Sequence, residues 1–520
     1  MVFSEQEHKL LEEVCDAFVG PVIHQDKDHE YWSARASDID LKSKIEQSAV
    51  KLPKSEVKDL KKLLKLLNGK ELGLTWAGPL KPFTDLTQKQ KEKLFLRWSR
   101  SPLNDLRRSF NALRKLSTFI YYSSDFEEVS FHSSLNYDRP EKIDTQEITR
   151  IEVGELPREL SAEYVIIGSG AGGGLAAELL AKAGKEVVVL EKGSFLNESD
   201  FNQKEWDMVS RLYDRGGALA TKDAGVTIFA GSCLGGGTTV NWNASFRTPD
   251  YIKEEWSELH HASHFASKDY AASEDFVFER FGVNKDNSSH NDQNQKLWEG
   301  ASELNLDPKV IARNVKGCHP NEKSCGYCGF GCKRGCKQGT LRTSLQEAEK
   351  LGAKIYCDAE VGSIQLKGNH LEGVAGYQLQ KGIKRKFTVK ARYLIVAAGA
   401  IHTPALLLRS GITHQEIGKN LYFHPTMAVA AKYNETMNPW HGPMMTTIVR
   451  DELRIDGNYG YWIETPPVHL GVMGMTLPWV SRQQHKEDLR YAPNLGAFIV
   501  LTRDKYGGKV GLDKQGRAKV

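Results

Sequence analysis

A glycine-rich segment at 168–173, followed by an acidic residue at the end of the next apolar run, has the residue types and spacing of a dinucleotide site. The segment reads Gly-Ser-Gly-Ala-Gly-Gly and fits the pattern G-x-G-x-x-G. The first glycine of this pattern permits a tight turn, the second lets the backbone approach a pyrophosphate, and the third lets a helix pack on a strand. The acid is Glu191, whose carboxylate would accept hydrogen bonds from a ribose hydroxyl and would repel a 2′-phosphate. The pattern therefore argues against NADP and does not distinguish FAD from NAD; its residues are Gly168, Gly170, Ala171, Gly172, Gly173 and Glu191.

The residues around this motif predict the order strand, helix, strand. Tyr164–Ile167 and Val187–Leu190 are short apolar runs rich in β-branched residues, which is typical of buried strands. A helix is expected between them, from about 173 to 183, which completes a βαβ unit. The helix amino terminus would face the phosphates with unpaired N–H groups and a positive dipole end. A glycine-rich turn without a ligand is the alternative, and the complete βαβ context with its acid makes it the weaker one.

A second part of the same fold is expected later in the chain. Tyr393–Ala398 predicts another buried strand, which leads into Gly399 and a helix from Pro404 to Arg409. Short alternating segments between Ile355 and Val389 predict strands inserted between two parts of one nucleotide-binding domain. We therefore predict an α/β fold in which the turn at 397–399 lies beside the glycine motif.

The composition excludes several classes of protein. The chain has 520 residues, of which 40% are hydrophobic, so it is neither disordered nor too small to bury a large core. Lys and Arg number 70 and Asp and Glu 66, so the net charge of +4 does not indicate a nucleic-acid partner. We find neither a secretory signal nor a membrane-spanning run, and we expect a cytoplasmic or peripheral membrane location with reduced cysteines.

The first 155 residues are predicted to be helical. Ser4 and Glu7 form a capping box for a helix that Gly20-Pro21 ends, and a later helical region from 87 to 122 is interrupted near Ser101-Pro102. A helix from Ser55 to Leu67 has one apolar face and one basic face. We favour a solvated surface for the basic face, and its alternative is contact with an anionic membrane. Its residues are Lys58, Lys61, Lys62 and Lys65.

Further segments carry a resemblance to a known family. Residues 231–242 read GSCLGGGTTVNW and residues 399–411 read GAIHTPALLLRSG. They resemble the two signatures of the glucose–methanol–choline (GMC) flavin oxidoreductases, with Thr413 in place of an expected glycine. The segments CGYCGFGC at 325–332, KQGT at 337–340 and GKNLYFHP at 418–425 are most similar to the long-chain (fatty) alcohol oxidase branch. The resemblance extends from Ala162 to about Arg503 and, loosely, into the amino-terminal part.

The resemblance implies a tightly bound FAD. It places the side-chain-free loop of Gly235, Gly236 and Gly237 against the pyrophosphate and flavin, Asn241 near the flavin, and the backbone of Val361 near adenine, with Ala398 and Gly399 closing the site. The implied organisation is a helical amino-terminal region (1–155), a Rossmann-like FAD-binding domain in two parts (160–260 and 351–425), a cap region with clustered cysteines (261–350) and an α+β substrate domain (426–520).

The resemblance also implies the reaction. A base would take the hydroxyl proton of a primary, long-chain alcohol while hydride passes to flavin N5, which yields the aldehyde. The electron acceptor would be O₂ or another acceptor. A second hypothesis is a dehydrogenase of sugars, polyols or sterols that passes electrons to another protein, and a third is a flavin-fold fragment without turnover.

The catalytic base has no assigned residue. In the family the base is a histidine near the carboxyl end, closely followed by Gly, Ser, Cys and Arg, and no histidine here has that setting. His424, His441 and His469 lie near prolines and are predicted to be structural or pocket residues, while His485 lies among charged residues and is predicted to be solvated. We expect that the sequence stops before the segment with the base, and that the chain alone does not oxidise alcohols.

Five of the eight cysteines lie between 318 and 336. Four of them, Cys325, Cys328, Cys332 and Cys336, have a spacing close to that of a bacterial ferredoxin run, although no proline follows the last one. They could hold an iron–sulfur cluster or zinc, and electrons could then leave a flavin through the cluster. The alternative, which we favour, is a loop of reduced thiols that covers the active site.

Overall fold

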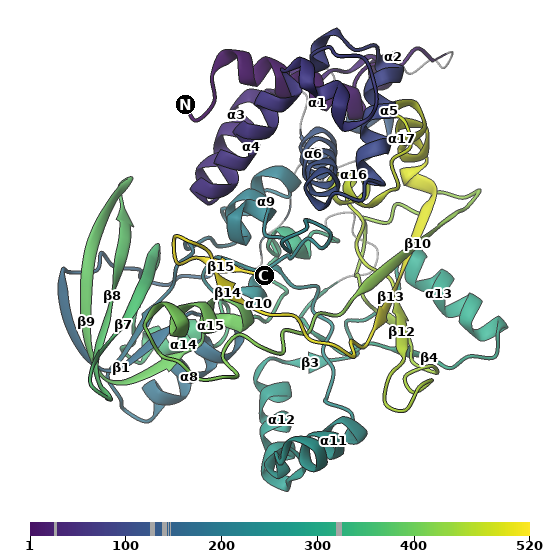
Figure 1. The fold of residues 1–520 in the computed structure, drawn as a ribbon. Coiled ribbons are helices and arrows are strands. Elements are labelled where there is room, and N and C mark those ends of the chain that lie inside the picture. Colours follow the sequence, from purple (N-terminus) through teal and green to yellow (C-terminus); the bar gives the residue numbers. More distant parts are fainter. Residues whose placement is uncertain (25–28, 125–130, 138–142, 144, 146, 319–324) are drawn as a thin grey trace.

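The six-stranded sheet that contains the glycine motif lies at one end of the molecule (Figure 1). The structure is a computed structural model, and it describes residues 1–520 except 25–28, 125–130, 138–142, 144, 146 and 319–324. The strand order is β6-β2-β1-β9-β8-β7, with β6, β2, β1 and β9 parallel and β9, β8 and β7 antiparallel. The strands are β1 (Glu159–Ile167), β2 (Val187–Leu190), β6 (Lys354–Tyr356), β7 (Ala359–Lys367), β8 (His370–Gln380) and β9 (Ile383–Val396).

The predicted strands lie in the middle of this sheet, and the apolar side chains of β1 and β2 are buried there, whereas the end of β9 is partly exposed. All four residues of β2 are buried, and β1 ends in three buried residues. The sheet joins 159–190 with 354–396, and the pair Ile167 and Val396 brings the ends of β1 and β9 together. The α/β fold predicted from the sequence is therefore confirmed.

Three helices lie beside this sheet: α8 (Ala171–Lys182), α14 (Ser344–Lys350) and α15 (Gly399–Arg409) (Figure 1). The helix predicted to begin at Pro404 begins instead at Gly399, so Pro404 lies inside it. Proline lacks an N–H and usually ends or starts a helix, and this preference misplaced the predicted start. Strand β9 is also longer than predicted, because its first half forms an antiparallel hairpin with β8.

A second, antiparallel sheet lies on the other side of the molecule, in the order β10-β13-β12-β11-β4. Its strand β4 comes from the region between the two parts of the first sheet, and the other strands come from residues beyond 425. They are β4 (Pro308–Val310), β10 (Thr426–Lys432), β11 (Thr447–Val449), β12 (Tyr461–Glu464) and β13 (Leu495–Thr502). Two-stranded pairs are formed by β3 (Val283–Asn284) with β5 (Arg313–Asn314) and by β14 (Gly511–Leu512) with β15 (Ala518–Lys519).

The remaining helices of the central part surround these sheets. They are α9 (Glu205–Leu212), α10 (Gly237–Val240), α11 (Asp250–His260), α12 (Lys268–Arg280), α13 (Asp292–Glu303), α16 (Leu470–Thr476) and α17 (Arg482–Arg490). Among the described helices, none is both long and apolar enough to span a bilayer.

The amino-terminal region is helical, as predicted. The capping box of Ser4 and Glu7 is present, and Gly20 is the carboxyl-terminal cap of the first helix. The helices are α1 (Glu5–Val19), α2 (His29–Ser33), α3 (Leu41–Lys51), α4 (Lys54–Leu67), α5 (Gln88–Ser99), α6 (Asn104–Ser123) and α7 (Phe131–Ser134). These helices share one apolar cluster with α16 and α17, in which Trp479 packs against Phe18 at 5.0 Å between ring centroids.

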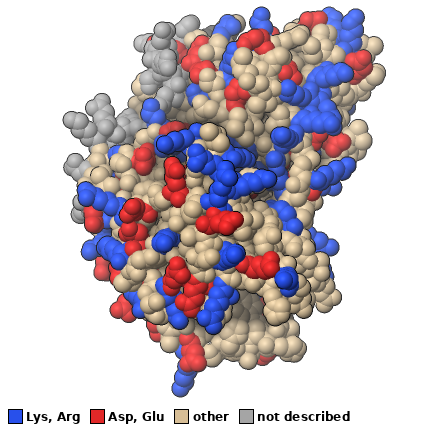
Figure 2. Space-filling model, turned by 90° about the vertical axis from the view of Figure 1, so that its left-hand side faces the viewer, with Lys and Arg blue, Asp and Glu red and all other residues tan. Residues whose placement is uncertain are grey.

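The apolar face of α4 packs against this cluster through buried Leu64 and Leu67. Its four predicted basic residues are exposed, and Figure 2 shows Lys and Arg side chains gathered on the upper part of this side of the molecule, with Asp and Glu among them. An amphipathic helix binds a membrane by burying its apolar face. The apolar face of α4 is already occupied, which favours the solvated surface.

Candidate dinucleotide site

The glycine motif forms the turn between β1 and α8, and its first and last glycines are required by packing. Gly168 has φ +94°, and a Cβ there would lie 2.5 Å from the carbonyl oxygen of Ala397. A Cβ on Gly173 would clash with the carbonyl oxygen of Gly168. The backbone N–H of Ala397 donates to Ile167 at 2.8 Å. The turn after β9 therefore lies directly beside the glycine motif, as the sequence predicts.

Other glycines of the motif, and glycines of the two neighbouring loops, have open space beside them. A Cβ on Gly170, Gly172, Gly237 or Gly399 would meet no heavy atom within 4 Å. Gly236 approaches Gly170 from the other loop, where a Cβ would lie 3.0 Å from the Cα of Gly170. Three loops from distant parts of the sequence thus lie close together at the carboxyl ends of the parallel strands, and each has a glycine with room beside it. Dinucleotides bind at this place in open α/β sheets, so the residues present fit an FAD.

Glu191 links two of these loops through Ser169. Its Oε2 accepts hydrogen bonds from the backbone N–H and the hydroxyl of Ser169 at 3.0 and 2.7 Å. Its Oε1 accepts from the backbone N–H of Gly193 at 2.7 Å. The backbone N–H of Gly235 in turn donates to the Ser169 hydroxyl at 3.0 Å. Each carboxylate oxygen has about two lone pairs, so Glu191 can hold the loop and still accept from a ribose hydroxyl.

Asn241 follows the short helix α10, and its side chain is exposed. Its carbonyl accepts a hydrogen bond from Lys337 Nζ at 2.6 Å. Lys337 is buried and also donates to the carbonyls of Thr239 and Cys328, both at 2.8 Å. Burial lowers the pKa of Lys337. One buried ammonium therefore ties the triple-glycine segment to the cysteine-rich loop, a role that the KQGT motif did not reveal in the sequence.

Val361 lies in β7 and not in a glycine loop. It is buried in an apolar cluster with Leu190 and Leu406, and its carbonyl accepts from Arg409 Nη2 at 3.3 Å. The structure thus places it close to β2, which ends just before Glu191, and its contact with adenine remains a prediction.

A polar triad at the same end of the sheet was not found in the sequence. Asp214 is buried, and its carboxylate accepts from His402 Nε2 at 2.8 Å and from Lys192 Nζ at 2.6 Å. Burial alone would raise the pKa of Asp214, but the hydrogen bond from His402 and the charge of Lys192 hold it well below its ordinary value. Lys192 follows Glu191, and His402 lies in the first turn of α15. The only sequence signal was the position of His402 within the segment 399–411.

Two of the carboxyl-terminal histidines, His469 and His485, are buried among structural partners. His469 is buried between the hydroxyl of Tyr137 at 2.8 Å and the carbonyl of Gly326 at 3.0 Å, and burial lowers its pKa to about 3. His485 was predicted to be solvated, and this was wrong. It is fully buried between the hydroxyl of Tyr122 at 3.2 Å and the carbonyl of Gly474 at 2.9 Å. Lys486, the next residue, is also fully buried, and its Nζ donates to the carbonyl of Tyr31 at 2.9 Å, so a charged neighbour in the sequence did not indicate exposure. His424 is exposed.

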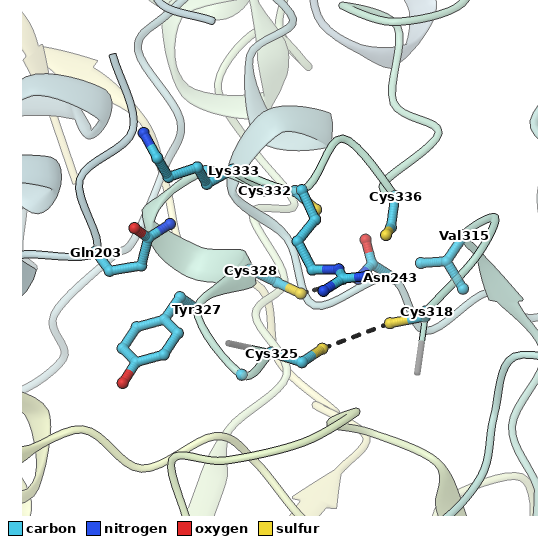
Figure 3. Close-up of a pocket in the computed structure, with 13 residues that line it drawn as sticks. Gln203, Asn243, Val315, Cys318, Cys325, Tyr327, Cys328, Cys332, Lys333 and Cys336 are labelled. Carbon is cyan, nitrogen blue, oxygen red and sulfur yellow. Dashed lines mark hydrogen bonds between the residues drawn. The ribbon is translucent and has the colours of Figure 1, made fainter. Parts of the chain in front are cut away.

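The clustered cysteines line one pocket (Figure 3). The sulfur atoms of Cys318 and Cys325 point toward one another at 3.5 Å. Asn243 Nδ2 donates to the sulfur of Cys328 at 3.3 Å. In the part of the chain that the structure describes, no three His, Cys, Asp or Glu side chains form a group that could hold a metal ion. The hypothesis of an iron–sulfur cluster or zinc at Cys325, Cys328, Cys332 and Cys336 therefore has no support from the geometry.

Comparison with known proteins gives the family. A GMC oxidoreductase family profile matches residues 209–426, and an NAD(P)-binding Rossmann-like profile matches residues 166–212. The long-chain-alcohol oxidase FAO4B of Arabidopsis thaliana is 34% identical over 375 residues. The chain belongs to the GMC oxidoreductase family. Within this family, a second Arabidopsis thaliana long-chain-alcohol oxidase, FAO4A, is 28% identical to this GMC chain over 594 aligned positions, which cover 96% of the chain and 79% of the relative.

The match to FAO4B covers 70% of this chain and 50% of FAO4B. The match to FAO3, another long-chain-alcohol oxidase of Arabidopsis thaliana, covers 49% of FAO3. The chain thus spans about half the length of these curated relatives. The crystal structure of formate oxidase superposes on this chain with a TM-score of 0.51 and 11% sequence identity. The superposition covers 70% of this chain and 77% of the formate oxidase chain. This likeness supports the fold alone.

Proposed function

We propose that this protein binds FAD in the space between the three glycine loops and oxidises a long-chain primary alcohol to the aldehyde. The observation that carries the proposal is the open space beside Gly170, Gly172, Gly237 and Gly399, next to the carboxylate of Glu191. The names of the Arabidopsis relatives support the substrate class.

The residues of the chain would divide the work of binding. Backbone N–H groups at the start of α8 and in the triple-glycine segment would hold the pyrophosphate, because a helix amino terminus and a glycine loop both present unpaired donors. Glu191 would accept a ribose hydroxyl, and the exposed Asn241 would lie at the flavin end. The flavin, when bound, supplies a hydride acceptor at N5.

The test of the cofactor site uses two glycines that differ in their place in the fold. Gly170→Val places a branched side chain in open space, so we expect a folded chain that no longer retains FAD after dialysis. Gly300→Val adds the same side chain in equally open space in α13, which packs on the second sheet, and is the control. A Gly170→Val chain that retains FAD as well as the unchanged chain would overturn the proposed site.

The substrate class is tested on the FAD-bound chain without oxygen. Bleaching of the flavin absorbance by dodecanol, and not by glucose, would support the proposed substrate class and would contradict the expectation, made from the sequence, that the chain alone does not oxidise alcohols. Bleaching by glucose alone would favour the sugar, polyol or sterol dehydrogenase. A chain that holds FAD and is bleached by neither alcohol would favour the flavin fold without turnover.

A further inference from the structure

The pocket formed by the cysteine-rich loop contains an uncommon combination of buried thiols and buried cations. It is lined by Cys318, Cys325, Cys328, Cys332 and Cys336, four of which are buried. Arg313 is fully buried, and its Nη1 lies 4.0 Å from the sulfur of Cys318. Lys337 is buried on the other side, where its Nζ donates to the carbonyl of Cys328.

These cations lack a full set of partners. Among the described residues, Nε and Nη2 of Arg313 have no hydrogen-bond partner, and the three bonds from Lys337 all end on neutral carbonyls. A buried charge without an opposite charge is costly. The group beside Arg313 that can become an anion is the Cys318 thiol, so this cation favours a thiolate at Cys318.

The direction of the pKa at Cys318, the thiol beside Arg313, agrees with this charge balance. The hydrogen bonds from Cys325 and Cys336, and then the charge of Arg313, hold the pKa of Cys318 well below its ordinary value. The hydrogen bond with Cys318 and burial raise the pKa of Cys325. In this sulfur pair, Cys318 is therefore the member favoured as the anion and Cys325 the member favoured as the thiol, which is the arrangement that thiol oxidation to a disulfide requires.

We propose that Cys318 and Cys325 form a peroxide-reactive dithiol site, in which Cys318 is oxidised first and Cys325 then forms a disulfide with it. The Cys318 thiolate displaces hydroxide from hydrogen peroxide, so the O–O bond breaks and Cys318 becomes a sulfenic acid. The Cys325 sulfur then attacks the Cys318 sulfur and releases water, with its proton leaving on that water. In total, two thiols and one hydrogen peroxide give one disulfide and two waters.

The source of peroxide rests on the proposed function. An oxidase that passes electrons from an alcohol to O₂ releases hydrogen peroxide. Lys337 connects the thiol pocket to the backbone of Thr239 and Asn241 in the triple-glycine segment. The dithiol would therefore lie beside the site that produces its oxidant.

Proteolysis can identify the bonded pair. Lys316, Lys323 and Lys333 are trypsin sites, and Tyr327 and Phe330 are chymotrypsin sites, so a double digest separates Cys318, Cys325, Cys328 and Cys332 into different peptides. After treatment of the whole chain with hydrogen peroxide and alkylation of the remaining thiols, we expect a link between peptides 317–323 and 324–327. The count of free thiols in denaturant should fall from eight to six.

The variants Cys318→Ser and Cys325→Ser should each abolish the link, whereas Cys357→Ser, at a buried cysteine outside the pocket, should keep it. A link from Cys318 to Cys336, eight thiols left after treatment, or stoichiometric iron or zinc that protects the thiols would each overturn the proposal. Added peroxide tests the reactivity of the dithiol alone. Dodecanol with O₂ tests whether the oxidase reaction supplies the peroxide. A link with added peroxide but none with dodecanol would retain the dithiol and contradict the proposed oxidase activity.

Discussion

The carboxylate of Glu191 and the residue Ser169 are joined by two hydrogen bonds, from the backbone N–H at 3.0 Å and from the hydroxyl at 2.7 Å. Ser169 lies inside the glycine motif, and Glu191 directly follows β2, the next strand of the sheet. Glu191 therefore holds the glycine loop in place through the same carboxylate that is expected to bind a ribose hydroxyl.

Replacing Glu191 should affect both stability and cofactor retention. Glu191→Ala leaves the N–H groups of Ser169 and Gly193 without their acceptor, and a hydrogen bond to a charged group contributes about 1.5–3 kcal/mol. We expect a folded chain whose FAD affinity is roughly ten- to a hundredfold lower. Glu191→Gln keeps one acceptor oxygen, so its loss of FAD affinity should be smaller. Unchanged flavin absorbance after dialysis of Glu191→Ala would contradict the ribose role.

Two adjacent glycines of α8 should respond in opposite ways to alanine. Gly173→Ala places a methyl group against the carbonyl oxygen of Gly168, and such overpacking costs about 1–3 kcal/mol. Gly172→Ala meets no atom within 4 Å and should leave the free energy of unfolding unchanged or raise it by up to about 1 kcal/mol. Urea unfolding of both variants measures the difference, and equal midpoints would show that the helix does not pack as described.

Glu464 should make the stability depend on pH. Burial raises its pKa from 4.5 to about 7, against the opposing charge of Arg450, and its Oε1 has no partner among the described residues. Because the folded pKa is the higher one, the protonated group favours folding below pH 4.5, and this contribution is lost as pH rises to about 7.

Glu464→Gln mimics the protonated group at every pH. It should match the unchanged chain below pH 4.5 and be the more stable protein above pH 7, by roughly 3 kcal/mol at most. Urea unfolding at pH 4, 6 and 8 measures this difference. A constant difference at the three pH values would be the contrary result.

Lys337 should be needed for the shape of the triple-glycine segment. Lys337→Met removes the donor from three carbonyls, and we expect the free energy of unfolding to fall by about 2–4 kcal/mol. Retention of FAD should fall with it. Lys333→Met is the matched control, because Lys333 Nζ donates to the carbonyls of Glu198 and Phe201. If both variants lose FAD equally, the link through Lys337 is not specific.

Much of the cofactor site could be predicted because its signals are local. The glycine motif, the two strands around it and Glu191 are neighbours in the chain, and their steric and hydrogen-bonding requirements appear directly as residue types. The partners of Asp214, Lys337 and His485 could not be found in this way. His402 lies 188 positions from Asp214, and Tyr122 lies 363 positions from His485.

The sequence by itself determined the α/β class, the glycine turn and the family, because each depends on short patterns with a fixed period or spacing. Only the tertiary structure decided which side chains are buried together. His485 follows charged residues, yet α6 and α16 cover it and remove it from water. Cys318 faces Cys325, and Arg313 lies beside the pair, because several chain segments converge on one pocket. Burial and charge balance depend on everything that packs around a group, and the order of residues along the chain does not contain that information locally.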